Sequence, residues 1–291
     1  MTNRALQFAS AIGLPFLTLA GAANADTATG GIKGPTQLGD GWAGAATVHP
    51  VRNTPSAFPR NGKAITAPYG LMAFCHYLRV REVEQYRTGN LKLEGRRLRP
   101  ECLPFPTDRP NQFTIDPAMP EGRANAYTLE FVQKYVNEAI QAATDDQMHG
   151  VSEFWRYPYD RGDCEDYALL KRLIASHIGE YLRNKPGARV RIAKRGDGIL
   201  EFFEAIVKIF ESNGANMTLL KNNTLTERSF SLGVVNDEKG EGHAILLART
   251  NRGTHLVLDN KFDTVREWAD TPYSAISSSG PGGLLQWHNA R

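Results

Sequence analysis

The spacing of apolar residues along the chain predicts three amphipathic helices. In residues 127–143 an apolar side chain recurs every three or four positions, at Leu129, Val132, Val136, Ile140 and Ala143. This period places the apolar side chains on one face of a helix. The same spacing is found in residues 164–179 and in residues 199–210. We therefore expect each segment to pack one helical face against a core.

The C-terminal part of the chain shows patterns typical of strands. Residues 230–235, 243–249 and 254–259 are short runs rich in aliphatic side chains, a composition that strands favour. Between the last two runs, Thr250-Asn251-Arg252-Gly253 has the polar and glycine content of a turn. The last two runs are therefore expected to form a β-hairpin.

The first 25 residues have the three parts of a secretory signal peptide. Arg4 supplies a basic start, residues 11–19 are apolar, and Ala23-Asn24-Ala25 matches a cleavage site. An N-terminal membrane anchor is the alternative, but the apolar run is shorter than a bilayer span. We expect export to the periplasm and removal of this segment, which leaves a mature chain of 266 residues without a membrane span.

Two stretches of the chain have unusual composition. Residues 26–68 are rich in Gly, Pro, Thr and Ala and show no sustained period, so we expect an irregular leader. Residues 79–99 are strongly basic and are interpreted as a solvated loop or helix face, with a patch for an acidic partner as the alternative. The net charge of only +3 argues against a nucleic-acid-binding protein.

The chain has three cysteines, an odd number for an exported protein. Cys75 and Cys102 could form a disulfide in an oxidising compartment. Cys164 is then left over, and a leftover thiol in such a compartment is a candidate reactive group. A small buried side chain is the alternative, which the acidic residues around Cys164 disfavour.

Cys164 lies at the predicted start of the second helix, within the run Arg161-Gly162-Asp163-Cys164-Glu165-Asp166-Tyr167. Asp163 is the expected N-cap residue. Unpaired backbone N–H groups and the helix dipole at this end favour a thiolate over a thiol. The same N–H groups can stabilise a developing oxyanion. The position therefore predicts an activated nucleophile.

The predicted hairpin supplies a histidine and an aspartate, in the chain order Cys, His, Asp. If the turn is centred between Asn251 and Arg252, His243 lies opposite Asn260, with Asp259 one step away. A register shifted by one residue places His243 directly opposite Asp259. In both registers the two side chains can meet across neighbouring strands. His243 would then take the thiol proton and Asp259 would orient the imidazole.

The run around Cys164, the sequence Gly242-His243-Ala244 and the sequence Val257-Leu258-Asp259-Asn260 together resemble the family of bacterial transglutaminase-like cysteine proteinases. The resemblance covers roughly residues 74–287. It implies a papain-like, transglutaminase-like α+β fold in which the cysteine-bearing helix packs on an antiparallel sheet. It also implies that Cys164 is the nucleophile, His243 the base and Asp259 the orienting residue.

The same resemblance implies a calcium ion near the nucleophile, because Asp163, Glu165 and Asp166 match the positions of the family's calcium ligands. The local charge supports this expectation. A carboxylate about 4 Å from a thiolate costs on the order of 4 kcal/mol at an effective dielectric constant of about 20. A bound Ca²⁺ would offset that cost. In the alternative, the carboxylates cap the helix and pair with Arg156, Arg161 or Lys171.

Two segments are longer here than in the family, within a peptidase domain expected at residues 69–291. Some 40 residues at about 180–225 separate the cysteine helix from the histidine strand. Residues 78–98 lengthen the segment between Cys75 and Cys102. Both are interpreted as insertions that reshape the access of substrate to the site.

These features predict an exported cysteine endopeptidase that cleaves a periplasmic or cell-surface protein. The resemblance implies a large biofilm adhesin as the substrate, and an inner-membrane cyclic-di-GMP receptor of the LapD kind as a partner. Two alternatives use the same residues. A transglutaminase would pass the acyl group to an amine in place of water, and an inert calcium-dependent binding module would keep the triad without turnover.

Overall fold

The computed structural model describes residues 57–59, 62–75, 112–158, 160–183, 199–280 and 283–290. The expected signal peptide, most of the expected leader, the insertion at 78–98 and Cys102 lie outside these ranges, as does the middle of the insertion at 180–225. Within the described ranges, no helix is both long and apolar enough to cross a membrane.

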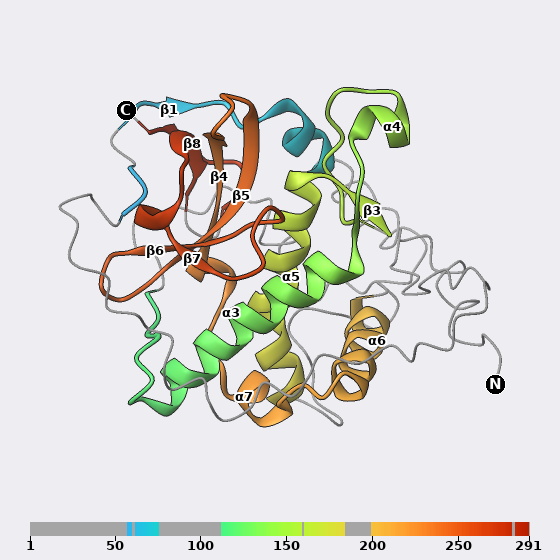
Figure 1. Cartoon of the computed structure of the whole chain (residues 1–291), viewed down its shortest axis with the longest axis vertical. Coiled ribbons are helices and arrows are strands. Elements are labelled where there is room, and N and C mark those ends of the chain that lie inside the picture. The colour runs from blue at the N-terminus through green and yellow to red at the C-terminus, as the bar shows by residue number, and fades with distance from the viewer. Residues whose placement is uncertain are drawn as a thin grey trace, which may run out of the picture.

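A large antiparallel sheet dominates the C-terminal part of the chain (Figure 1). The described residues give it seven strands in the order β1-β9-β8-β4-β5-β6-β7. Their bounds are Ala64–Ile65 for β1, Phe230–Asn236 for β4, Gly242–Arg249 for β5, His255–Leu258 for β6, Arg266–Glu267 for β7, Ser274–Ser279 for β8 and Trp287–Asn289 for β9. The three predicted strands are confirmed as β4, β5 and β6.

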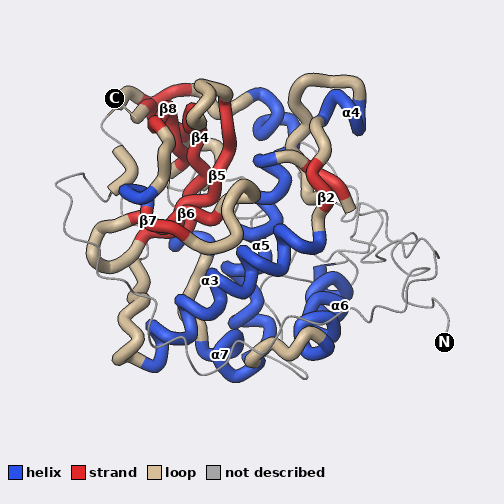
Figure 2. The backbone as a smooth tube through the Cα atoms, viewed as in Figure 1, coloured by secondary structure: helices blue, strands red, loops and turns tan. Residues whose placement is uncertain are grey.

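Two long helices cross the molecule beside the sheet, as the tube view in Figure 2 also shows. They are α3, Pro120–Ala139, and α5, Cys164–Arg183. The shorter helices are α4, Asp145–His149, α6, Ile199–Ser212, and α7, Met217–Asn222, with 3-10 turns η3, Glu227–Ser229, and η4, Trp268–Asp270. Helix α5 packs on β5, so the expected α+β arrangement of a cysteine-bearing helix on an antiparallel sheet is confirmed.

The first predicted helix is displaced toward the N-terminus. Helix α3 begins at Pro120 and ends at Ala139, whereas the apolar spacing predicted residues 127–143. Pro120 suits the first turn, because its fixed φ matches a helix and its missing N–H has no helical partner there. Ile140 then takes an extended backbone (φ −105°, ψ 128°). The chain continues into β2, Gln141–Ala142, instead of a further helical turn.

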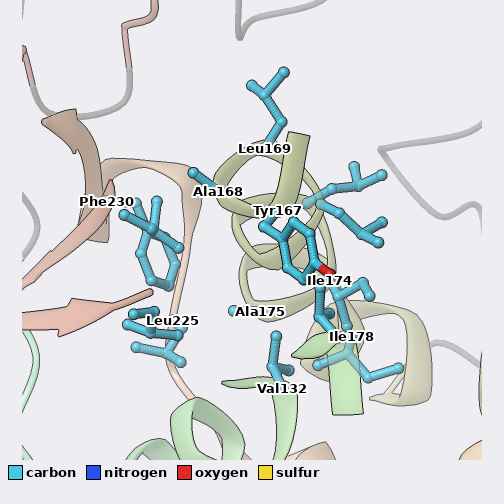
Figure 3. Packing of buried hydrophobic residues seen from close by; sticks show 14 of the residues in the cluster. Val132, Tyr167, Ala168, Leu169, Ile174, Ala175, Ile178, Leu225 and Phe230 are labelled. Carbon is cyan, nitrogen blue, oxygen red and sulfur yellow. The ribbon is translucent and has the colours of Figure 1, made fainter. Parts of the chain in front are cut away.

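The main hydrophobic core lies between the two long helices and one face of the sheet (Figure 3). Helix α5 contributes Ile174 and Ile178, which are fully buried together with Val132 of α3. Phe210 of α6 joins the core, with its ring edge-on to that of Tyr135 at a centroid distance of 4.8 Å. The described part of the expected insertion is therefore packed into the main core.

A second, smaller cluster covers the other face of the sheet. Ile245 and Leu247 of β5 belong to it, whereas Leu246 belongs to the main core. This alternation is the period of two expected for a strand with both faces buried. Phe58 also joins the second cluster, and its N–H donates to Nδ1 of His255 at 3.0 Å. The part of the expected leader that is described is thus ordered against the sheet, and it also supplies strand β1.

Candidate active site

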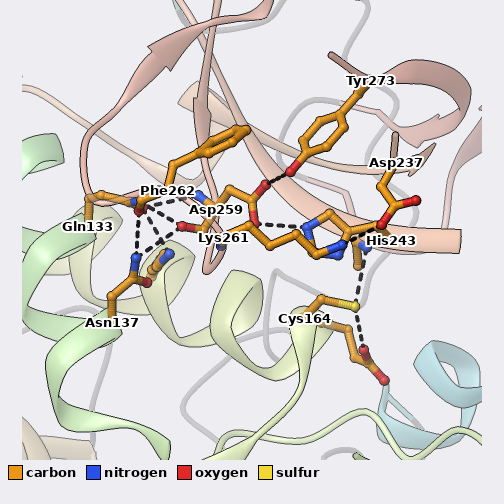
Figure 4. A network of polar contacts seen from close by, with 12 residues as sticks. Gln133, Asn137, Cys164, Asp237, His243, Asp259, Lys261, Phe262 and Tyr273 are labelled. Carbon is orange, nitrogen blue, oxygen red and sulfur yellow. Dashed lines mark hydrogen bonds and ion pairs between the residues drawn. The ribbon is translucent and has the colours of Figure 1, made fainter. Parts of the chain in front are cut away.

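Cys164 is the first residue of α5, as predicted. The carbonyl of Asp163 accepts the N–H of Tyr167 at 3.1 Å, so helical hydrogen bonding starts at the expected N-cap residue. The sulfur accepts the backbone N–H of Ala244 at 3.3 Å. Because Ala244 follows His243 in β5, the sulfur lies against the strand that carries the imidazole (Figure 4).

His243 and Asp259 form a buried pair, with Nε2 and Oδ1 2.8 Å apart. Only 4% of His243 and 2% of Asp259 are exposed. The other carboxylate oxygen, Oδ2, accepts the Tyr273 hydroxyl at 2.5 Å, and the Tyr273 ring lies 5.6 Å from the imidazole centroid. The Lys261 N–H donates to Oδ1 at 2.9 Å. Both oxygens of Asp259 are therefore held by donors.

These donors keep Asp259 ionised in spite of its burial. Burial raises the pKa of a carboxyl group, but the hydrogen bonds from His243 and Tyr273 outweigh it, so the pKa of Asp259 lies below its ordinary value. An ionised Asp259 accepts a hydrogen bond from Nε2–H of His243. Nδ1 then remains as the basic nitrogen of the imidazole, free to take a proton from a thiol.

The hairpin register differs from both registers considered from the sequence. Leu246 pairs with Leu258. The Thr250 N–H donates to the Thr254 carbonyl at 2.9 Å, which leaves a three-residue loop, 251–253, in which Gly253 has a φ of 78°. Continued beyond the ladder, this register places Asp259 opposite Ile245 and two positions from the residue opposite His243. Diagonal neighbours of this kind share a face of the sheet and come within reach of each other. The two side chains meet because a loop with an odd number of residues leaves both on the same face of the sheet.

The turn that carries Asp259 rests on two amide side chains of α3. Gln133 donates through Nε2 to the carbonyl oxygens of Asp259, at 2.6 Å, and Phe262, at 2.5 Å. Asn137, one helical turn along, donates to the same two carbonyls at 3.1 and 2.8 Å. Lys171 of α5, which the alternative reading paired with the acidic residues, instead donates to Oε1 of Gln133 at 2.8 Å. Side chains from both long helices thus fix the position of Asp259.

An acidic cluster lies on the other side of Cys164. One oxygen from each of Asp145, Asp163 and Glu165 lies within 4.8 Å of the others. Two of the three expected metal ligands are thus together, with Asp145 beside them. Asp166, the third, is fully buried, and its carboxylate accepts the backbone N–H of Arg156 at 3.0 Å. Arg156 Nε also lies 3.6 Å from this carboxylate, as the alternative pairing predicted.

A short parallel strand pair brings the cluster together. Residues 141–142 of β2 pair with residues 161–162 of β3, Arg161–Gly162, which places the start of α4 beside the start of α5. Gly162 permits the close approach, because a Cβ atom there would lie 2.7 Å from Cβ of Asp166. Asp145 follows Thr144, the N-cap residue of α4, and accepts the N–H of Phe154.

The site gathers acidic groups in a buried environment that disfavours their ionised forms. Burial raises the pKa of Glu165 to about 10, with a further contribution from Asp163, whose own pKa burial also raises. Burial and the charge of Glu165 raise the pKa of Cys164 well above its ordinary value, although the Ala244 N–H opposes this. The Cys164 thiol donates to Glu165 at 3.3 Å. The acids thus oppose the thiolate that the helix start favours.

The donor set fits a hard cation. In the described part of the chain, Oδ1 of Asp145 and Oδ1 of Asp163 are buried without a hydrogen-bond donor. A buried carboxylate oxygen without a partner is costly, and oxygen ligands of this type are those that Ca²⁺ prefers. The residues present therefore suit a divalent cation better than they suit a cluster of bare carboxylates.

Several residues of the site were not found from the sequence. Tyr273, Gln133 and Asn137 reach Asp259 from segments that carry no motif. Asp145 lies 18 positions before Asp163, outside the acidic run around Cys164. The available signal is weak: two amide side chains lie one helical turn apart on an amphipathic helix, and a buried amide needs a hydrogen-bond partner.

A family model described as "Bacterial transglutaminase-like cysteine proteinase BTLCP" matches residues 106–184 and 213–290, just over half of the chain. The three catalytic candidates fall within the matched residues, and α6 lies in the gap between them. No curated protein sequence matches the chain.

Solved structures of LapG from Legionella pneumophila resemble the chain at low identity. The EGTA-treated structure, a structure named simply LapG and the calcium-bound structure are 16%, 15% and 15% identical, with TM-scores of 0.31, 0.32 and 0.34 respectively. The matches cover 52%, 53% and 55% of this chain, and 61%, 64% and 67% of the LapG chains. The chain therefore spans less than two thirds of the first two of these proteins.

Proposed function

Since the chain belongs to the family of bacterial transglutaminase-like cysteine proteinases, we propose that it is a cysteine endopeptidase with Cys164 as nucleophile, His243 as base and Asp259 as the orienting residue. One observation carries the assignment of residues. The imidazole of His243 pairs with buried Asp259 at 2.8 Å and comes from β5, the strand whose Ala244 N–H donates to the sulfur of Cys164. The three parts of a triad are thus assembled from α5, β5 and the end of β6.

The geometry supports a standard acyl-transfer sequence. His243 Nδ1 accepts the thiol proton, and the Cys164 thiolate attacks the carbonyl carbon of the scissile peptide. The backbone N–H groups at the start of α5 face the developing oxyanion. The imidazolium, stabilised by Asp259, then gives its proton to the leaving amine as the peptide bond breaks. Water, deprotonated by His243, hydrolyses the resulting thioester and restores the thiol.

Calcium dependence is part of the proposal. Asp145, Asp163 and Glu165 would hold the ion. Asp166 stays a predicted ligand, because its Oδ2 accepts no hydrogen bond, and burial, with a smaller contribution from Asp163, raises its pKa. Backbone carbonyls or water would complete the six to eight oxygens that Ca²⁺ takes. When bound, the ion would neutralise the charge beside Cys164 and lower the cost of its thiolate.

We also propose a cellular compartment and a substrate for the protein. The signal-peptide pattern in residues 1–25 supports a periplasmic location. Family membership supports a protein substrate, for which we propose a large surface adhesin, and a cyclic-di-GMP receptor of the LapD kind as the partner that controls access to it. A Cys75–Cys102 disulfide belongs to the same proposal, since the periplasm is oxidising.

Substitution of the nucleophile tests the proposed function. Extract from a strain that lacks the protein is incubated with purified wild type or Cys164→Ala, and new peptide N-termini are labelled and identified by mass spectrometry. The wild type should generate specific termini, and the Ala variant should lose on the order of 10⁴-fold or more in rate. His243→Ala should behave alike, whereas Asp259→Asn should keep more activity.

Two controls accompany this experiment, one for the effect of substitution itself and one for the type of acyl acceptor. Lys134→Ala, on the exposed surface of α3, should cleave like the wild type. A primary amine added at high concentration tests for transglutaminase chemistry, in which the amine appears in the product. If Cys164→Ala yields the same termini at a comparable rate, Cys164 is not the nucleophile. If wild-type Cys164 is alkylated no faster than free cysteine, the chain is an inert binding module.

A further inference from the structure

We propose that Lys171 is a positioning residue of the triad, which acts through Gln133 to fix the turn that carries Asp259. The inference rests on the proposed function, because it assigns a role in the same reaction. Lys171 and Gln133 are both fully buried, on α5 and α3 respectively. Neither contacts the thiol or the imidazole in the described structure, so each would act only through Asp259.

The carboxamide of Gln133 has to adopt one orientation for the turn to be held. Its Oε1 accepts from Lys171 Nζ at 2.8 Å and from the Asp259 N–H at 3.1 Å. Its Nε2 donates to the carbonyls of Asp259 and Phe262 at 2.6 and 2.5 Å. Gln133 therefore pairs with both backbone groups of Asp259, in the manner of a neighbouring strand.

Lys171 selects this orientation over the flipped one. A lysine side chain has hydrogen-bond donors and no acceptor while it is charged. If the amide were turned over, Nε2 would face both the ammonium group and the Asp259 N–H, and Oε1 would face two carbonyls. Every contact would then set a donor against a donor or an acceptor against an acceptor, and a buried polar group left without a hydrogen bond is costly. The ammonium thus makes the productive orientation strongly preferred.

The cost of burying Lys171 argues that it has a specific task. Burial lowers the pKa of its ammonium group to about 7, although the charge of Asp259 opposes the shift. A methionine or leucine would fill this core position without that penalty. The ammonium also lies 5.7 Å from the ring centroid of Tyr167. This cation–π contact does not replace a hydrogen bond. The hydrogen bond to Gln133 is the interaction that a lysine can make at this position and an apolar side chain cannot.

The placement of Lys171 also links the nucleophile to Asp259. Lys171 lies seven residues after Cys164, two turns along the same helix. A rigid helix therefore connects the thiol to the lysine, and the lysine connects to the turn of Asp259 through one side chain. Misplacement by about 1 Å in such a chain can cost up to 100-fold in rate.

A double-mutant cycle tests the inference. Wild type, Lys171→Met, Gln133→Leu and the double variant are compared in excess calcium. The probe is iodoacetamide, and the rate of alkylation is read from the Cys164 peptide by mass spectrometry. Each single substitution should slow alkylation on the order of tenfold. The double variant should be no slower than either single variant, because both remove the same connection. Losses that multiply in the double variant would overturn the inference.

A spectroscopic measurement separates positioning from general destabilisation. The ¹⁵N shifts of His243 report which nitrogen carries the proton. Lys171→Met and Gln133→Leu should both reduce the Nε2–H tautomer that Asp259 stabilises. Leu173→Ala, a matched core substitution on α5, should lower the melting temperature and leave both the tautomer and the alkylation rate as in wild type. An unchanged tautomer in both Lys171→Met and Gln133→Leu would overturn the inference.

The outcomes distinguish this inference from the proposed function. If wild-type Cys164 reacts no faster than free cysteine, the proposed function fails, while the tautomer measurement still tests the Lys171–Gln133 connection. If wild type is activated and Lys171→Met is equally reactive, only the inference fails. Should Lys171→Met not fold, Gln133→Glu takes its place, since it keeps the contact with Lys171 and loses the two donated bonds. It should slow alkylation to the same extent, and a wild-type rate would count against the inference.

Discussion

At the scale of single residues, the site depends on how completely Asp259 is surrounded by donors. The imidazole and the Lys261 N–H hold one carboxylate oxygen, and the Tyr273 hydroxyl holds the other. Phe262 stacks on the Tyr273 ring at a centroid distance of 5.5 Å, and so limits the directions in which the hydroxyl can point. Tyr273 therefore orients the aspartate in the way that the aspartate orients the histidine.

Tyr273→Phe should lower activity by several-fold to about 100-fold, which corresponds to about 1–3 kcal/mol for a buried acceptor left without its donor. The pKa of Asp259 should rise, because the tyrosine bond is one of the contacts that lower it. The loss should be smaller than that of Asp259→Asn, since His243 keeps its partner. Alkylation of Cys164 by iodoacetamide measures it, with the exposed Tyr69→Phe as the control. Equal rates for the two variants would show that the hydroxyl has no such role.

The residues that sequence reasoning found and missed differ in where their signal lies. Cys164, His243 and Asp259 each lie in a short local pattern, so the chain order was enough to propose a triad. Gln133 contacts Asp259 across 126 positions. Tertiary packing decides which helical face contacts which turn. A single glutamine in the sequence does not indicate such a contact.

At the scale of elements, the strands were easier to predict than their pairing. The aliphatic runs gave β4, β5 and β6 within one or two residues, because both faces of each are buried. The hairpin register depends on one extra residue in the loop, and Gly253 with its positive φ allows the three-residue form. For helix α3, in contrast, the start was predicted seven residues too late. Its first turns bury small residues such as Ala124, which have no amphipathic period.

The described helical residues 69–75 include Cys75 and pack against the loop before Cys164. A Cβ on Gly70 would lie 2.5 Å from Cδ1 of Trp155, so the two segments are in close contact. We expect Cys75, which is buried in the main core, to form a disulfide with Cys102, closing a loop of 27 positions. The loop-entropy estimate gives roughly 3 kcal/mol of stabilisation.

Counting free thiols in denatured, unreduced protein from the periplasm tests this disulfide. One free thiol per chain supports the pairing, and Cys164→Ala should then show none. Cys75→Ala should lower the melting temperature and add a free thiol at Cys102. Three free thiols in periplasmic protein would rule the disulfide out and leave the segment held by packing alone.

At the scale of the whole molecule, the two sides of Cys164 are stabilised by different interactions. The His243 side is held by hydrogen bonds within the fold, whereas the acidic side holds three groups whose pKa values burial raises. Helix α6, in the gap of the family match, packs against α3 on the far side of the core from the sheet. The segment outside the family match thus packs against the helix that carries Gln133.

Calcium removal should therefore make stability depend on pH. A carboxyl group whose folded pKa is raised holds its proton in the native state after the unfolded chain has lost it. The unfolding free energy then falls as pH rises between the ordinary value of 4.5 and the value of about 10 for Glu165. One such proton gives a slope of about −1.4 kcal/mol per pH unit. Excess calcium binds the ionised carboxylates, so it should raise the melting temperature and flatten this slope.

Melting temperatures from pH 5 to pH 8, in excess calcium and in EGTA, measure the effect. The difference between the two curves should widen as pH rises, because calcium competes with protons for the same oxygens. Asp145→Asn should narrow the difference by removing one charged ligand, whereas the exposed Lys134→Ala should leave it unchanged. Alkylation of Cys164 should slow in EGTA over the same range, since the positive charge of the ion no longer favours the thiolate. Two superimposable melting curves, with equal alkylation rates, would show that the cluster orders itself without a metal ion.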